Sequence, residues 1–170
     1  YKVVNEYSYE ELRDIFYKYG EEKFSNSIAK KIVEEREKKK IETTLELVEI
    51  IKSAVPDKYK REHHPARKIF QAIRIEVNDE LDVLKKSLTD ALDLIKVGGR
   101  ICVITFHSLE DKIVKDIFKE NSTMDNSLKK LPIVPEELLP KYKLVKTLEP
   151  TEDEILNNKR ARSAKLRVIE

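Results

Sequence analysis

Hydrophobic residues recur every three or four positions over the first part of the chain, which is the spacing of amphipathic helices. Ser8 and Glu11 form a capping-box pattern at the start of the first predicted helix. Gly20 is expected to end that helix in a left-handed conformation. A second helix is predicted over about residues 23–39, with apolar positions on one face.

A third helix is predicted from Thr43, whose capping partner is Glu46, to Val55. Residues 57–64 are polar and basic with no apolar period, which predicts a linker or an exposed loop. A helical stripe then continues over residues 65–98. It predicts one long helix or a bent pair, following a small bundle.

The pattern changes after Gly98 and Gly99, where residues 101–104 form a continuous apolar run. Such a run is typical of a strand covered on both faces in a parallel α/β sheet. Ser108 is expected to cap the next helix through Asp111. The order of helix, turn, strand and helix predicts half of a doubly wound α/β unit.

The remaining chain is predicted to alternate loops with short elements. Residues 121–140 contain three prolines and suggest a loop. Strands are expected at residues 142–148 and 164–169, with a short capped helix at 151–156 between them. The last strand alternates in polarity, so it is expected to be less buried than the strand at 101–104.

Composition excludes several classes of protein. The chain has 170 residues and 3 glycines, too few and wrongly spaced for a glycine-rich nucleotide loop. A single cysteine excludes an internal disulfide framework and a cysteine-rich zinc site. No apolar run is long enough to span a bilayer, and the net charge is only +2. A soluble cytoplasmic protein is expected, and any nucleic-acid surface must come from local clusters of basic residues.

The residues directly after the central strand are the first candidate site, because ligands of open α/β sheets bind beyond the strand ends. Phe106 could stack on a base, His107 could exchange a hydrogen bond with it, and Ser108 begins a helix. The alternative is purely structural: Phe106 packs, Ser108 caps, and His107 is an ordinary surface residue.

A basic cluster near the end of the chain is the second candidate. It could neutralise the phosphates of a structured RNA, or it could protect a strand edge against aggregation. The cluster comprises Lys159, Arg160, Arg162, Lys165 and Arg167.

The histidine pair His63 and His64 lies beside Arg61 and Arg67. Adjacent side chains diverge and no cysteine or acidic partner has ligand spacing, so a metal site is disfavoured. A positively charged loop fits these residues better.

Three long segments carry a resemblance to a known family. They read HPARKIFQAIRIEVNDEL over residues 64–81, GGRICVITFHSLEDKIVK over 98–115 and KRARSAKLRV over 159–168. In this order they resemble the bacterial 16S rRNA cytosine-N4 methyltransferases of the MraW type. The segment YGEEKFSNSIAKKIV is similar to the helical insertion of that family.

The resemblance implies a helix-rich α/β protein with part of a class I, Rossmann-like methyltransferase fold and S-adenosylmethionine as cofactor. Residues 1–68 correspond to the helical insertion, thought to recognise RNA, and residues 69–170 to the carboxyl half of the catalytic domain. The cofactor-binding half is expected to lie upstream of Tyr1, so no catalytic or cofactor residue can be assigned here. The residues expected to contact 16S rRNA are Phe106, His107, Ser108, Arg160, Arg162, Lys165 and Arg67.

On this interpretation the 170 residues are an enzyme fragment that is inactive alone. Half a sheet would expose an apolar face, so either the rest of the domain or a second copy of the chain is expected to cover it. Two other classes stay open: a self-standing RNA-binding module without catalysis, and a helical interaction protein without RNA affinity.

Overall fold

The computed structural model describes residues 1–124 and 134–170, which form two compact units, Tyr1–Glu80 and Leu81–Glu170. The division lies later than the expected boundary at residue 68. The reason is that Ala66, Ile69 and Ala72 are buried in the core of the first unit. The assignment of residues 1–68 to RNA recognition remains a prediction.

The first unit is entirely helical in its regular structure. Its helices are α1 (Lys2–Glu6), α2 (Tyr9–Lys18), α3 (Ser25–Lys38), α4 (Thr44–Ser53), α5 (Asp57–Glu62) and α6 (Pro65–Asn78). The predicted capping boxes at the starts of α2 and α4 are confirmed, with Ser8 bonded reciprocally to Glu11 and Thr43 to Glu46. The short helix α1 carries no such signal in the sequence and was not predicted.

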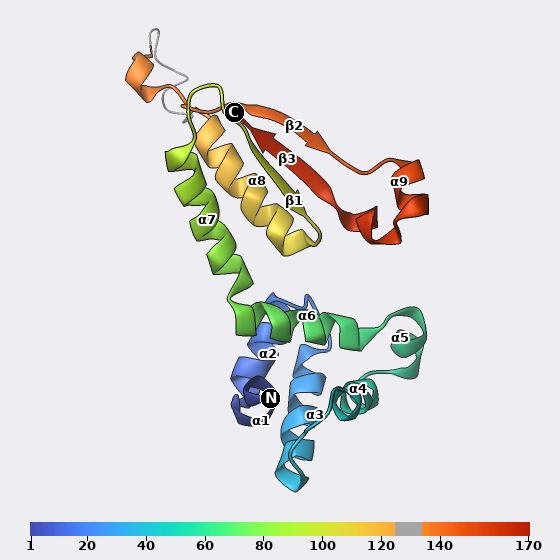
Figure 1. Cartoon of the computed structure of the whole chain (residues 1–170). Helices are drawn as coiled ribbons and strands as arrows, with labels where there is room; N and C mark the ends of the chain where they lie inside the picture. The colour runs from blue at the N-terminus through green and yellow to red at the C-terminus, as the bar shows by residue number, and fades with distance from the viewer. Residues whose placement is uncertain (125–133) are drawn as a thin grey trace. The chain divides into compact units, whose positions relative to one another are not determined.

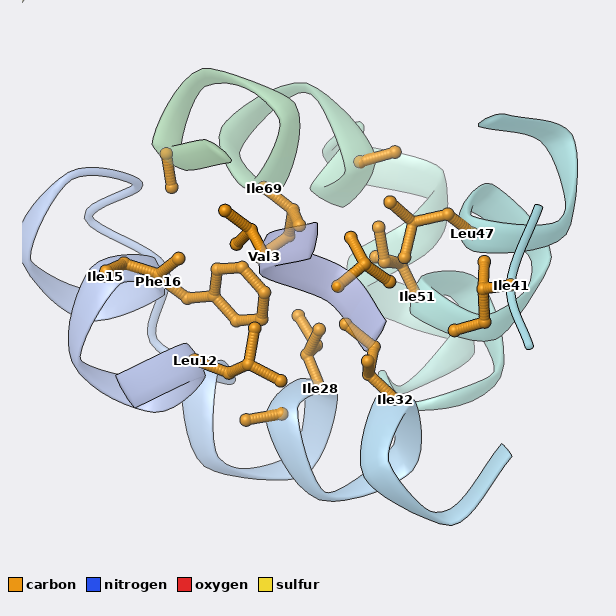
Figure 2. Close-up of a cluster of buried hydrophobic side chains, with 14 of the residues drawn as sticks. Val3, Leu12, Ile15, Phe16, Ile28, Ile32, Ile41, Leu47, Ile51 and Ile69 are labelled. Carbon is orange, nitrogen blue, oxygen red and sulfur yellow. The ribbon is translucent and has the colours of Figure 1, made fainter. Parts of the chain in front are cut away.

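The core of this unit is a layer of aliphatic side chains around Phe16 (Figure 2). Leu12, Phe16, Ile28, Ile32 and Ile69 are fully buried. They come from α2, α3 and α6, and they recur at helical spacing in the sequence. Burial of side chains of this size stabilises a fold by roughly 1.5–3 kcal/mol each, so the amphipathic pattern accounts for the bundle.

Two sequence predictions in this unit are wrong. Residues 57–62 form helix α5, which has no apolar period because Tyr59 alone is buried. Gly20 is not left-handed; that conformation falls on Glu21, with φ of 47°. Gly20 is instead needed for close packing, because a Cβ there would lie 2.6 Å from the Phe16 carbonyl oxygen.

The sequence predicts one long helix or a pair of helices over residues 65–98, and the structure has two helices. Helix α6 ends at Asn78, and the capping residue after it, Asp79, is left-handed with φ of 51°. The next helix, α7, runs over Glu80–Leu94. Gly98, with φ of 82°, then supplies the turn before the first strand.

The second unit contains a three-stranded sheet in the order β1-β3-β2. Its strands are β1 (Ile101–Thr105), β2 (Leu144–Leu148) and β3 (Lys165–Ile169). Helix α8 (Ser108–Ser122) follows β1, and α7 and α8 cover one face of the sheet (Figure 1). The core here is formed by Leu88, Leu92, Val114, Phe118 and Ile169.

The expected parallel pairing is wrong for the described strands, because β3 pairs antiparallel with both β1 and β2. The central position belongs to β3, so Val168 and Ile169 are buried, and the expectation of a less buried last strand is also wrong. Strand β1 lies at an edge. Its Cys102 and Ile104 are exposed, so its apolar run is not covered on both faces within this chain.

Shorter elements complete the unit. Thr151 caps α9 (Glu152–Asn157), as predicted, and two 3-10 turns are η2 (Glu136–Leu138) and η3 (Lys159–Ser163). The loop predicted over residues 121–140 falls partly at 125–133, outside the described residues. None of the helices described is both long and apolar enough to cross a membrane.

Candidate functional site

The first candidate site is the turn from β1 into α8, and a histidine caps the helix. The Nδ1 atom of His107 accepts the N–H of Glu110 at 3.4 Å. The Glu110 carboxylate accepts the N–H groups of Phe106 and His107 at 2.9 and 3.3 Å. The predicted cap by Ser108 through Asp111 is therefore wrong, because the helix starts one residue earlier in the chain, at Ser108, and His107 is its cap.

This capping box determines which side chains face outward. The side chain of His107 is only 13% exposed, and its Nε2 lies 3.2 Å from Glu110 Oε1. Phe106 is 54% exposed, although it is a large apolar residue. The structural alternative considered for this segment, with Phe106 packed and His107 on the surface, is the reverse of what is found.

The charge of Glu110 is favoured by its hydrogen bonds. Partial burial raises the pKa of the Glu110 carboxyl, but the bonds from His107 and from the Phe106 N–H outweigh burial and leave the pKa below its ordinary value. Because Nδ1 of the His107 ring accepts the N–H of Glu110, the N–H of the ring lies on Nε2. The ionised Glu110 therefore holds the Phe106 backbone in place at neutral pH.

A second set of contacts fixes the same end of the sheet. Arg167 donates from Nε and Nη2 to the two carboxylate oxygens of Asp111, at 2.7 and 3.0 Å. The buried Thr105 hydroxyl lies 3.4 Å from Asp111 and 3.4 Å from the Lys165 carbonyl. Arg167 also reaches Thr147 on β2 at 3.2 Å.

This network joins α8 to all three strands. The hydrogen bond from Arg167, against a smaller opposing effect of burial, lowers the pKa of Asp111. The same bond raises the pKa of Arg167. Bidentate arginine–carboxylate pairs are directional, so this pair fixes the angle at which α8 leaves the sheet.

The basic cluster near the chain end divides into two groups. Lys165 and Arg167 face carboxylates: Arg167 is paired with Asp111, and Lys165 lies 3.6 Å from Glu149. Arg160 and Arg162 are exposed on η3 and make no ion pair within residues 1–124 and 134–170. The sequence does not distinguish the two groups, because the acidic partners are far away along the chain.

Strand register brings part of this cluster to the candidate site. Lys165 pairs with Thr105, so η3 enters the sheet at the end where β1 terminates. Arg162 and Phe106 therefore belong to the same sheet end. Arg67 is exposed on α6 of the first unit. The ring of His63, four residues earlier, packs on Tyr59 with 4.7 Å between the two ring centroids.

Two residues of the site escaped the sequence analysis as functional candidates. Glu110 holds the Phe106 backbone, and Asp111 was interpreted only as a capping partner. The signal for Glu110 is the spacing His107-x-x-Glu110, which has the form of a capping box with histidine in place of serine or threonine.

Comparisons with known proteins agree with the resemblance carried by the three sequence segments. The chain matches the MraW methylase family over residues 1–170. It is 58% identical over 173 residues to the ribosomal RNA small subunit methyltransferase H of Streptococcus mutans serotype c. The match covers 100% of this chain and 54% of the relative, so the chain spans about half the length of the curated relative it matches.

Proposed function

The chain belongs to the MraW methylase family, and we propose on this premise that it forms part of an S-adenosylmethionine-dependent methyltransferase. The proposed reaction places a methyl group on the N4 amine of a cytidine in 16S rRNA of the small ribosomal subunit, in the cytoplasm. The name of the Streptococcus mutans relative supports a small-subunit rRNA substrate. The proposed fold of the complete catalytic domain is Rossmann-like.

The observation that carries the proposal is an exposed aromatic ring at the carboxyl end of β1. Phe106 is 54% exposed while its own N–H is held by Glu110 at 2.9 Å. A fixed backbone with a free ring suits stacking on an unpaired base, which RNA-binding proteins use widely. In the Rossmann-like fold proposed for the complete domain, ligands bind beyond the carboxyl ends of the parallel strands.

Cofactor binding does not fit the residues of this chain. A methyl donor with a nucleoside part is bound through a glycine-rich turn after a strand, and the glycines here are Gly20, Gly98 and Gly99. Gly98 and Gly99 precede β1, and Gly20 is packed against α2 and α6 backbone. We therefore place the cofactor in the half of the enzyme that corresponds to the unmatched part of the relative.

The residues of this chain would bind and orient the RNA. A cytosine amine is a weak nucleophile because its lone pair is delocalised into the ring, so alignment contributes much of the rate. Phe106 would hold the base by stacking, and His107 and Glu110 would keep Phe106 in place. Arg160 and Arg162 would neutralise neighbouring phosphates, with Lys165 beside them. Direct contacts of His107, Ser108 and Arg67 with RNA stay predictions.

The exposed face of the sheet supports a larger domain. Cys102, Ile104 and Leu148 lie on the face opposite α8, and Ile104 and Leu148 are 59% and 39% exposed. We propose that the remainder of the methyltransferase domain covers this face. A second copy of the chain is the other possible cover, and sedimentation of the full-length protein separates the two: a monomer supports the first and a dimer the second.

The proposed function is tested by incubating the full-length protein with small ribosomal subunits and labelled S-adenosylmethionine. Nucleosides from the digested 16S rRNA are then separated by mass spectrometry. The expected product is N4-methylcytidine. RNA binding without any methyl transfer would favour a non-catalytic RNA-binding module, and transfer to another nucleoside would contradict the assigned substrate.

A further inference from the structure

A groove lies between α8 and the edge strand β2, away from the turn at Phe106. It has a volume of about 330 Å³ and is lined by residues of α8, β2 and β3. Phe118 at its base is fully buried, whereas Leu144 and Val145 are 46% and 39% exposed. Those lining it are Lys115, Phe118, Lys119, Leu144, Val145, Lys146, Thr147 and Arg167.

The charge of this groove has one sign. Lys115, Lys119, Lys146 and Arg167 line it and no carboxylate of the described residues does, although the whole chain has 34 basic and 32 acidic residues. Arg167 is paired with Asp111. In the part of the chain that the structure describes, the three lysines make no ion pair. Lys115 and Lys119 project from α8, whereas Lys146 is in register with Val168 and borders the groove at the β2 edge of the sheet.

Protection of a sheet edge does not explain the arrangement. A lysine on β2 would discourage pairing with another strand, and Lys146 alone could serve that purpose. Lys115 and Lys119 belong to α8, four residues apart on the side facing the groove. Like charges at this spacing destabilise a helix slightly, and an anion bound between them would offset that cost.

We propose that this groove binds the sugar-phosphate backbone of the rRNA substrate, an inference that rests on the proposed function. Lysine ammonium groups are point charges that attract phosphates without reading bases. Phe118, the aromatic residue of the groove, is buried, so the groove offers no ring for base stacking. Backbone contact here and base contact at Phe106 would give the RNA two separate sites on the second unit.

The test compares RNA affinity of the full-length protein and of its K115E/K119E/K146E variant across a range of salt concentrations. A naked 16S rRNA fragment is the probe. Loss of the phosphate contacts should weaken binding at least about tenfold and reduce the slope of log affinity against log salt by about 2–3. A second variant with glutamine at the three positions should lose a similar slope with a smaller loss of affinity, because it adds no negative charge.

The matched control is K86E/K96E/K141E, which changes the same net charge at three exposed lysines of the second unit outside the groove. We expect this control to keep most of the salt slope. Equal loss of slope in both variants would overturn the inference, since it would reflect net charge alone. Unchanged binding of naked rRNA by the groove variant would also overturn the inference. This holds even if the variant has lost contact with a ribosomal protein instead.

The two proposals can fail separately. If the wild-type protein neither binds nor methylates rRNA, the proposed function fails and the groove inference falls with it. If the wild type methylates rRNA and the groove variants bind it with unchanged affinity and salt slope, only the groove inference fails. Circular dichroism and thermal unfolding of both variants verify that α8 and the sheet remain folded.

Discussion

Asp111 on α8 and Arg167 on β3 form a bidentate ion pair, with nitrogen–oxygen distances of 2.7 and 3.0 Å and side chains 17% and 15% exposed. The pair connects the helix after β1 to the central strand. We predict that Asp111→Ala lowers the free energy of unfolding by about 2–3 kcal/mol, because it leaves a partly buried guanidinium without its carboxylate. Urea unfolding measures the change.

The control for this prediction is Asp116→Ala on the same helix, an exposed position that should change stability by less than about 0.5 kcal/mol. The pKa of Asp111 is lowered in the folded state, so the pair contributes stability above the ordinary pKa of aspartate. That contribution is lost as the pH falls below it. Equal stabilities of the wild type and Asp111→Ala at neutral pH would contradict the role of the pair.

Tyr59 in α5 donates to the buried carboxylate of Glu22, at 2.9 and 3.1 Å. Tyr59→Phe should destabilise the first unit by about 1–3 kcal/mol, because the Glu22 carboxylate loses a donor where water cannot replace it. Tyr17→Phe is the matched control, since Tyr17 is 70% exposed and should have almost no effect. Thermal unfolding of both variants checks this.

The Tyr59 hydroxyl also makes the stability of the first unit depend on pH in the alkaline range. Burial, and then the bond to Glu22, raises the pKa of Tyr59 to about 12. A raised folded-state pKa means that this stabilisation is complete below the ordinary value of 10.0 and is lost as the pH rises toward about 12. The Tyr59→Phe variant should lose less stability over this range, as measured by urea unfolding at each pH. Parallel curves for the two proteins would contradict the assignment.

The Glu46 carboxylate is expected to make the stability of α4 fall at acid pH. Its carboxylate accepts from Lys39, and from the N–H groups of Glu42 and Thr43, and these bonds lower its pKa to about 2. A lowered folded-state pKa contributes stability that is present above the ordinary value of 4.5 and is lost as the pH falls toward about 2. Glu46→Gln should flatten the pH dependence of the free energy of unfolding in this window, as measured by urea unfolding at each pH.

Glu110 is expected to act through Phe106. Glu110→Ala removes the acceptor for the Phe106 and His107 N–H groups, so the ring loses its fixed position. The rate of methyl transfer should fall, and kcat/KM for rRNA should fall more than kcat. Glu110→Gln keeps an oxygen acceptor and should restore part of the activity. If the role of Glu110 were purely structural, Glu110→Ala would lower the thermal stability. Glu110→Gln would then restore no activity at temperatures where both variants are folded.

Local sequence signals predict most helices of the first unit but not the pairing of the sheet. Amphipathic spacing and capping boxes are local signals, so α2, α3 and α4 follow from them directly. Helix α5 was missed because only Tyr59 of its residues is buried. Strand direction and order depend on pairing between distant segments, such as Thr105 with Lys165, and no local pattern encodes that pairing.

The candidate site shows the same division. Phe106, His107 and Ser108 could be located as residues after a strand, but their roles depend on geometry. A histidine is an uncommon helix cap, so the rule that favours serine pointed to the wrong residue. The partition of the basic cluster follows from the fold, which brings Asp111 to Arg167 on β3 and leaves Arg160 without an ion pair among the residues that the structure describes.

The most direct test of the account compares kcat/KM for rRNA methylation by the full-length wild-type protein, Phe106→Ala and Phe106→Tyr. Phe106 is 54% exposed, so its truncation should leave the melting temperature nearly unchanged. Loss of a stacking contact should lower kcat/KM about tenfold or more in Phe106→Ala, while Phe106→Tyr keeps most of it. Activity of Phe106→Ala within about twofold of the wild type would contradict the placement of the RNA base at the end of β1.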